Sequence, residues 1–164
     1  QEQRDAIQTG KGFAVWADHD LPRPSVRKEM LTESTMKALE LLSQNKKGFF
    51  LMVEASQIDD YGHANQLDPL VEEILDFDRT IGKVFEWAAA DGETLVVVTP
   101  DHETGGLPLV GGSLPEGEII GKFSTGDHSG VMVPVYAFGP GAELFTGIYE
   151  NTDIFEKIKY LLKL

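Results

Sequence analysis

The middle of this 164-residue chain reads as a strand, a long amphipathic helix and a second strand, and this order constrains the fold most. Residues 49–53 (FFLMV) and 94–99 (TLVVVT) have the apolar character of strands buried on both faces. Between them, apolar residues recur at three- and four-residue steps from Leu70 to Ala88, as they do on one face of a helix. Such a unit requires parallel strands and a right-handed crossover, so the sequence predicts an α/β fold.

Capping residues predict where the helices begin and end. Asp68 is a candidate N-cap and Pro69 suits the first helical position, while Asp91-Gly92 ends the helix. Thr32 is a candidate cap for an earlier helix that runs through about Asn45. Residues 102–130 are rich in glycine and are expected to form a functional loop with a small hairpin. Residues 131–138 are expected to form a third strand, and a last helix is expected after a cap at Asn151 or Thr152.

Composition excludes several classes of protein. The net charge of −13 argues against nucleic-acid binding, which needs clustered Lys and Arg. No apolar run approaches the roughly 20 residues of a membrane helix, and zero cysteines exclude a disulfide framework. The chain opens on Gln1 rather than Met, so the lack of a visible signal peptide decides nothing.

Acidic residues and histidines gather at the predicted ends of the strands. Glu54 directly follows the first strand, and Asp101 and His102 directly follow the second. Since ligands bind beyond the carboxyl ends of parallel strands, we expect these side chains to face one crevice.

Three further candidates lie close to the same predicted edge. Asp59 and His63 belong to the irregular segment after Glu54, and His128 precedes the third strand, so its loop must fold back. Imidazole and carboxylate ligands without cysteine indicate zinc or a similar metal. A divalent cation would also remove the repulsion between the carboxylates. His19 belongs to no such cluster and is expected at the surface.

Three stretches of the chain resemble the C-terminal half of the alkaline phosphatase family: FFLMVEASQIDDYGHAN, TLVVVTPDHETGG and STGDHSGVMVPVYAFGPGAELFTGIYENTDIF. The match covers roughly residues 30–160 and includes the spacing between the motifs. The resemblance implies a three-layer α/β sandwich with a mostly parallel sheet. Residues 1–164 would then be the C-terminal part of a single domain.

The resemblance also implies a metal centre. One zinc ion would be held by Asp59, His63 and His128, a second zinc ion by Asp101 and His102 among others, and a magnesium ion by Glu54 among others. In the family, two zinc ions bracket the phosphoryl group of a phosphate monoester while a serine attacks it. Family members are commonly homodimers, and the parent protein would be periplasmic or secreted.

This chain departs from the family pattern in what it lacks. The nucleophilic serine of the family follows an aspartate, and none of the seven serines of this chain has that context. The phosphate-binding arginine and the other magnesium ligands are also missing. We therefore expect a fragment that is inactive alone and exposes apolar surface that favours self-association.

Two other readings remain open. The chain could be a non-catalytic metal-binding module that folds alone. It could also belong to another hydrolase of the same superfamily, acting on phosphodiesters, phosphonates or sulfate esters.

Overall fold

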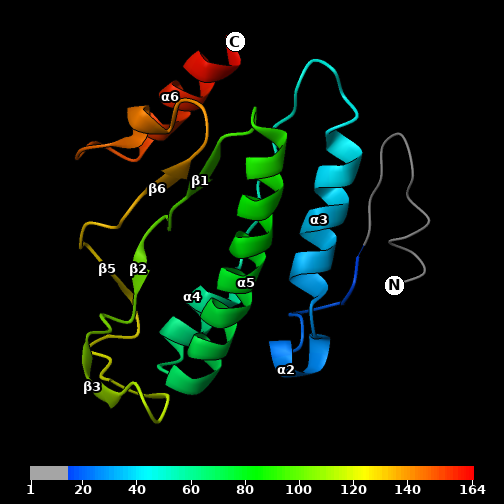
Figure 1. The fold of residues 1–164 in the computed structure, drawn as a ribbon. Coiled ribbons are helices and arrows are strands. Elements are labelled where there is room, and N and C mark those ends of the chain that lie inside the picture. The colour runs from blue at the N-terminus through cyan, green and yellow to red at the C-terminus, as the bar shows by residue number, and fades with distance from the viewer. Residues whose placement is uncertain (1–14) are drawn as a thin grey trace. The chain divides into compact units, whose positions relative to one another are not determined.

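The computed structural model describes residues 15–164, and its elements are labelled in Figure 1. The helices are α2 (Pro24–Arg27), α3 (Met30–Leu42), α4 (Gln57–His63), α5 (Leu67–Asp91), α6 (Thr152–Leu162) and the 3₁₀ helix η1 (Ala142–Phe145). The strands are β1 (Val96–Val98), β2 (Glu103–Thr104), β3 (Leu109–Ser113), β4 (Glu118–Gly121), β5 (His128–Ser129) and β6 (Tyr136–Phe138). The chain divides into two compact units, Gln1–Lys83 and Val84–Leu164, which are described separately.

The predicted helices are present, but two of the predicted caps are wrong. Helix α3 begins at Met30, so Thr32 lies inside it, where its hydroxyl is 2.7 Å from that of Thr80. Helix α5 begins at Leu67, which places Asp68 in its first turn instead of at the cap. The predicted end of α5 is confirmed, since Gly92 follows it with a φ of 73°. A hydroxyl or carboxylate residue in the sequence therefore locates the start of a helix to within a few residues, but it does not identify the capping residue.

In the first unit, the buried residues of α5 include Leu70 and three polar residues. Glu73 and Asp76 are each 1% exposed and Thr80 is 2% exposed, whereas Ile74 and Leu75 are 43% and 52% exposed. Helical periodicity had predicted the opposite for Ile74, as part of the apolar face. Burial of two carboxylates is tolerated because a guanidinium, that of Arg27 in α2, pairs with both of them.

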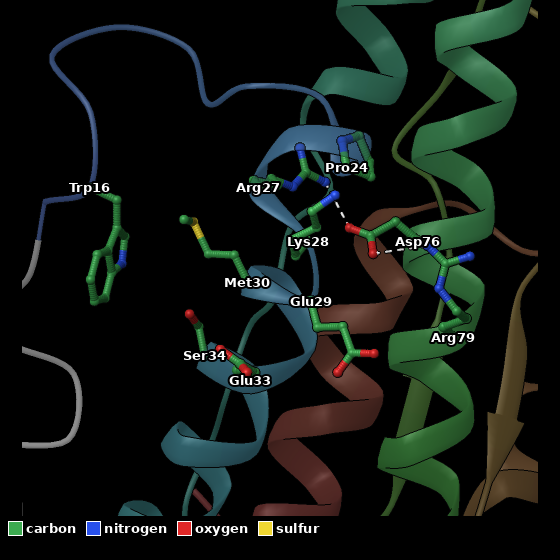
Figure 2. Close-up of a pocket in the computed structure, with 10 residues that line it drawn as sticks. All are labelled: Trp16, Pro24, Arg27, Lys28, Glu29, Met30, Glu33, Ser34, Asp76 and Arg79. Carbon is green, nitrogen blue, oxygen red and sulfur yellow. Dashed lines mark hydrogen bonds and ion pairs between the residues drawn. The ribbon is translucent and has the colours of Figure 1, made fainter. Parts of the chain in front are cut away.

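A cavity of about 670 Å³ opens beside this ion cluster. Figure 2 shows Arg27 and Arg79 on either side of the Asp76 carboxylate, with Trp16 and Met30 farther along the wall. The described residues that line the cavity include none of the six predicted metal ligands.

Residues 49–53 form no hydrogen-bonded strand, contrary to the prediction. Their exposure nevertheless alternates, with Phe50 62% and Met52 75% exposed and Phe49, Leu51 and Val53 half-buried. Alternation is the pattern of a strand with one covered face, not of one buried on both faces.

In the second unit, β1 pairs with β6, and Val97 lies opposite Ala137. The ring centroids of Phe85 and Phe138 are 5.3 Å apart, which joins the end of α5 to this pair. Gly139 has a φ of 102°, and a Cβ there would lie 2.3 Å from the carbonyl oxygen of Thr94. Only glycine permits this close approach of the segment after β6 to the segment before β1.

The predicted third strand is shorter than expected. Strand β6 begins at Tyr136, two residues after Pro134, which cannot donate to a ladder. The α/β class is confirmed by the mixture of helices and strands. However, the three strand pairs found within residues 15–164 are all antiparallel, so the predicted parallel pairing is not present there.

The glycine-rich segment contains the expected hairpin, formed by β3 and β4 with Gly112 opposite Ile119. Beside it, β2 and β5 form a two-residue ladder that joins the two ends of the segment. Within residues 15–164 no helix is long and apolar enough to cross a membrane.

Candidate metal centre

Helix α4 carries two of the predicted ligands, Asp59 and His63. The sequence had predicted irregular structure here, but the spacing of four residues is that of neighbours on one helix face. The Asp59 Oδ2 atom is 3.4 Å from the His63 Nε2 atom, and the two side chains are 40% and 39% exposed. An acidic residue in the first turn and a histidine in the last turn also suit the helix dipole.

Asp101 and His102 form a second pair, just after β1 as predicted. The Asp101 Oδ2 atom is 3.2 Å from the His102 Nε2 atom. The carboxylate is 87% exposed and the imidazole 28% exposed, so the oxygen is open to solvent while the ring is held by the protein.

Both pairs have the spacing of two ligands on one ion. Donor atoms about 2.0–2.1 Å from a tetrahedral zinc lie about 3.3–3.4 Å apart. The observed separations of 3.4 Å and 3.2 Å match this value. One carboxylate oxygen and one imidazole nitrogen are also ligands that zinc accepts in proteins. The residues present therefore fit zinc at each pair.

His128 lies next to His102 in the second unit. Their rings are stacked, with centroids 3.5 Å apart and planes inclined by 21°. The contact follows from the ladder, in which His128 of β5 pairs with Thr104 of β2. The Thr104 hydroxyl lies 3.2 Å from Nδ1 of His102, which leaves Nε2 as the ring nitrogen on the Asp101 side.

Glu103 organises the loop around these histidines, and the sequence reasoning missed it. Its carboxylate accepts hydrogen bonds from the backbone N–H groups of Gly106 and Leu107, each at 3.1 Å, and from the Ser129 hydroxyl. The Ser129 hydrogen bond is the chief reason why the pKa of Glu103 lies below its ordinary value; the two backbone hydrogen bonds also lower the pKa, and desolvation opposes them. The available signal was the pair of glycines after Glu103, which permits a tight turn.

Within the first unit the structure brings Asp59 to His63, and within the second it brings His102 to Asp101 and to His128. Glu54 is exposed in the segment before α4. The joining of ligands from the two units into complete sites is a proposal.

Comparison with known sequences identifies the family. The model of the alkaline phosphatase family matches residues 14–123 and 119–164. Alkaline phosphatase 4 of Bacillus subtilis is 31% identical over 93% of this chain and 46% of its own length. Alkaline phosphatase H of Pseudomonas aeruginosa is 36% identical over 82% of this chain and 32% of its own length.

Solved structures agree. The alkaline phosphatase of the Antarctic bacterium TAB5 superimposes with a TM-score of 0.84 at 46% identity, over 91% of this chain and 45% of that one. A variant of the TAB5 enzyme was solved with Mg bound in its M3 site. The chain spans about half the length of such relatives, or less. Since the family model covers nearly all of its residues and the fold agrees, the chain belongs to the alkaline phosphatase family.

Proposed function

We propose that this chain supplies metal ligands to a phosphatase that hydrolyses phosphate monoesters. The observation that carries the proposal is the spacing of the pairs Asp59–His63 and Asp101–His102, which suits co-ligands of zinc. Membership in the alkaline phosphatase family supports the reaction class. The name of a further relative, streptomycin-6-phosphate phosphatase of Streptomyces griseus, also describes a phosphate ester as its substrate.

In this proposal the ligands divide between three ions. Asp59, His63 and His128 hold one zinc ion, which has three protein ligands as a catalytic zinc site requires. Asp101 and His102 contribute to a second zinc ion, and Glu54 contributes to a magnesium ion. When bound, such ions neutralise charge on a transferring phosphoryl group and lower the pKa of a bound oxygen nucleophile.

The residues of the chain have the task of holding these ions in place. Thr104 contacts Nδ1 of His102 and so orients the ring, so that Nε2 and the Asp101 carboxylate can bind the same ion. The helix geometry of α4 does the same for Asp59 and His63. Ligands that are set in place before an ion binds lose less conformational entropy when it does.

The complete enzyme needs parts that these 164 residues do not show. None of the seven serines has the Asp-Ser context of the family nucleophile, and the relatives are about twice as long or longer. We therefore expect no measurable turnover of a chromogenic phosphate monoester by this polypeptide with zinc and magnesium supplied. A homodimeric, periplasmic or secreted parent protein completes the proposal.

Zinc titration of the chain by calorimetry tests the proposal. We expect at least one tight site, which His63→Ala abolishes and His19→Ala leaves unchanged. His19 is the matched control because it is an exposed histidine outside both ligand pairs. Equal zinc affinity of the two variants, or no binding by the parent chain, would overturn the metal assignment. Binding of zinc with robust turnover would instead overturn the missing-nucleophile argument.

A further inference from the structure

We propose that Glu103 is a positioning residue of the metal centre, whose carboxylate ties the Gly105-Gly106 turn to β5 and so holds His128 against His102. This inference rests on the proposed zinc-binding function. All of the contacts that carry it lie within the second unit of the chain.

Both carboxylate oxygens of Glu103 accept hydrogen bonds. Oε1 accepts the N–H of Leu107 at 3.1 Å. Oε2 accepts the N–H of Gly106 at 3.1 Å and the hydroxyl of Ser129. Each acceptor faces a donor, and charge makes each hydrogen bond stronger than one to a neutral amide. A carboxylate with three protein donors is built into the loop rather than solvated.

The position of Glu103 in the ladder links the two histidines. Glu103 directly follows His102, and Ser129, its partner in register, directly follows His128. The side-chain bond between Glu103 and Ser129 therefore joins the two strands one residue beyond each ligand. Because the ladder of β2 and β5 has only two residues on each strand, its backbone bonds alone would be a weak restraint.

The turn that receives the carboxylate has little freedom. The Gly105 N–H donates to the Asp127 carbonyl at 3.0 Å, which extends the ladder by one bond. Gly106 has a φ of 53°, and a Cβ on it would lie 2.1 Å from the hydroxyl oxygen of Ser124. The Ser124 hydroxyl donates in turn to the Gly106 carbonyl at 3.0 Å. The Glu103 carboxylate thus accepts hydrogen bonds from the backbone of a closely packed turn.

Glutamine has the shape of Glu103 but not its hydrogen-bonding capacity. One carboxylate oxygen becomes an NH₂ group, which would face at least one backbone N–H donor. Glu103→Gln should therefore loosen the turn and the Ser129 contact without emptying the space. Ser129→Ala removes one donor only and should cause a smaller effect of the same sign. Glu118→Gln, an exposed change of equal charge on β4, is the matched control.

The test measures zinc affinity by competition with a chromophoric chelator, together with the imidazole ¹⁵N signals of His102 and His128 before zinc is added. We expect Glu103→Gln to weaken zinc binding by about 10- to 100-fold, as loss of a supporting contact behind metal ligands usually does. The histidine signals of the zinc-free variant should shift, while Glu118→Gln should match the parent chain in both measurements.

Several results separate this inference from the proposed function. If the parent chain binds no zinc, the proposed function fails. If it binds zinc and Glu103→Gln and Ser129→Ala keep its affinity and histidine signals, the positioning role is wrong. If Glu103→Gln does not fold, Ser129→Ala decides alone: weaker zinc binding with shifted histidine signals supports the role, and unchanged values overturn it.

Discussion

Arg27 and Glu73 form a two-point ion pair in the first unit, with Nη1–Oε1 and Nη2–Oε2 distances of 3.0 Å and 2.6 Å. Their side chains are 5% and 1% exposed. Nη2 also donates to Asp76 at 2.8 Å, so one cation serves two buried carboxylates. Burial disfavours the charged guanidinium, but the hydrogen bonds to the two carboxylates outweigh it and raise the pKa of Arg27.

Replacement of this arginine should destabilise the first unit strongly. Arg27→Met keeps most of the side-chain volume but leaves Glu73 buried without its cation and Asp76 with the exposed Arg79 alone. Removing one partner of a buried ion pair costs about 3–5 kcal/mol. Urea unfolding followed by circular dichroism should show a loss of this size in the free energy of unfolding.

Arg79→Met is the matched control, because Arg79 also pairs with Asp76, at 3.2 Å, but its side chain is 59% exposed. Because the Arg79 guanidinium is largely in water, its loss should cost much less than the loss of Arg27. Equal losses for Arg79→Met and Arg27→Met would show that burial does not decide the strength of this cluster.

Glu72 should make the stability of the first unit depend on pH. Hydrogen bonds from Ser25, supported by Arg23, lower the pKa of its carboxyl group against the opposing effect of desolvation. A carboxyl group whose pKa is lower in the folded state stabilises the fold above its unfolded pKa of about 4.3. This contribution disappears as the pH falls through the folded pKa.

Glu72→Gln should therefore lower the free energy of unfolding near pH 7 and have a smaller effect at about pH 2, well below the unfolded pKa. Urea unfolding at the two pH values measures the difference. Asp78→Asn, an exposed change of equal charge on α5, should show no such pH dependence. A loss for Glu72→Gln that is the same at both pH values would contradict the linkage.

The helices could be predicted from the sequence because periodicity and breaking residues act locally. The end of α5 at Asp91, before Gly92, is an example. The burial of Glu73 and Asp76 in α5 could not be predicted, since it depends on Arg27, which lies 46 residues before Glu73. Hydrophobic periodicity predicts that apolar residues are buried, and it does not detect a cation far away in the sequence that offsets the cost of burying carboxylates.

In the candidate site, contacts between residues close in sequence could be predicted, and contacts that depend on the folded loop could not. The residues of the candidate ligand pairs Asp59–His63 and Asp101–His102 are close in sequence, so the sequence alone predicted that they would lie together. The stacking of His102 on His128 depends on a two-residue ladder that closes a long loop. Neither strand of that ladder has a hydrophobic pattern, so the support from Glu103 and Ser129 had no sequence signal beyond nearby glycines.

Exposed apolar side chains in the second unit should cause self-association. Exposure alternates along residues 133–138, and Met132 and Tyr136 are 80% and 62% exposed. We expect the exposed apolar side chains of this segment to favour association with a second copy of the chain. Sedimentation velocity should show association that rises with concentration and that Met132→Lys reduces. Gln44→Lys adds the same charge at an exposed polar position and should have no effect; monodisperse monomers of the parent chain would rule the association out.

Zinc should raise the stability of the fold by an amount that grows with the logarithm of its affinity for the histidine and carboxylate pairs. A ligand that binds only the folded state at one hundred times its dissociation constant adds about 2.7 kcal/mol to the free energy of unfolding. Thermal unfolding with zinc and with a chelator measures the shift in midpoint. Asp59→Asn weakens one ligand and should reduce the shift, because a neutral amide oxygen binds zinc less well than a carboxylate. Asp78→Asn, which lies outside the ligand pairs, should keep the full shift. A midpoint that a chelator leaves unchanged in zinc-loaded protein would mean that no ion binds these residues.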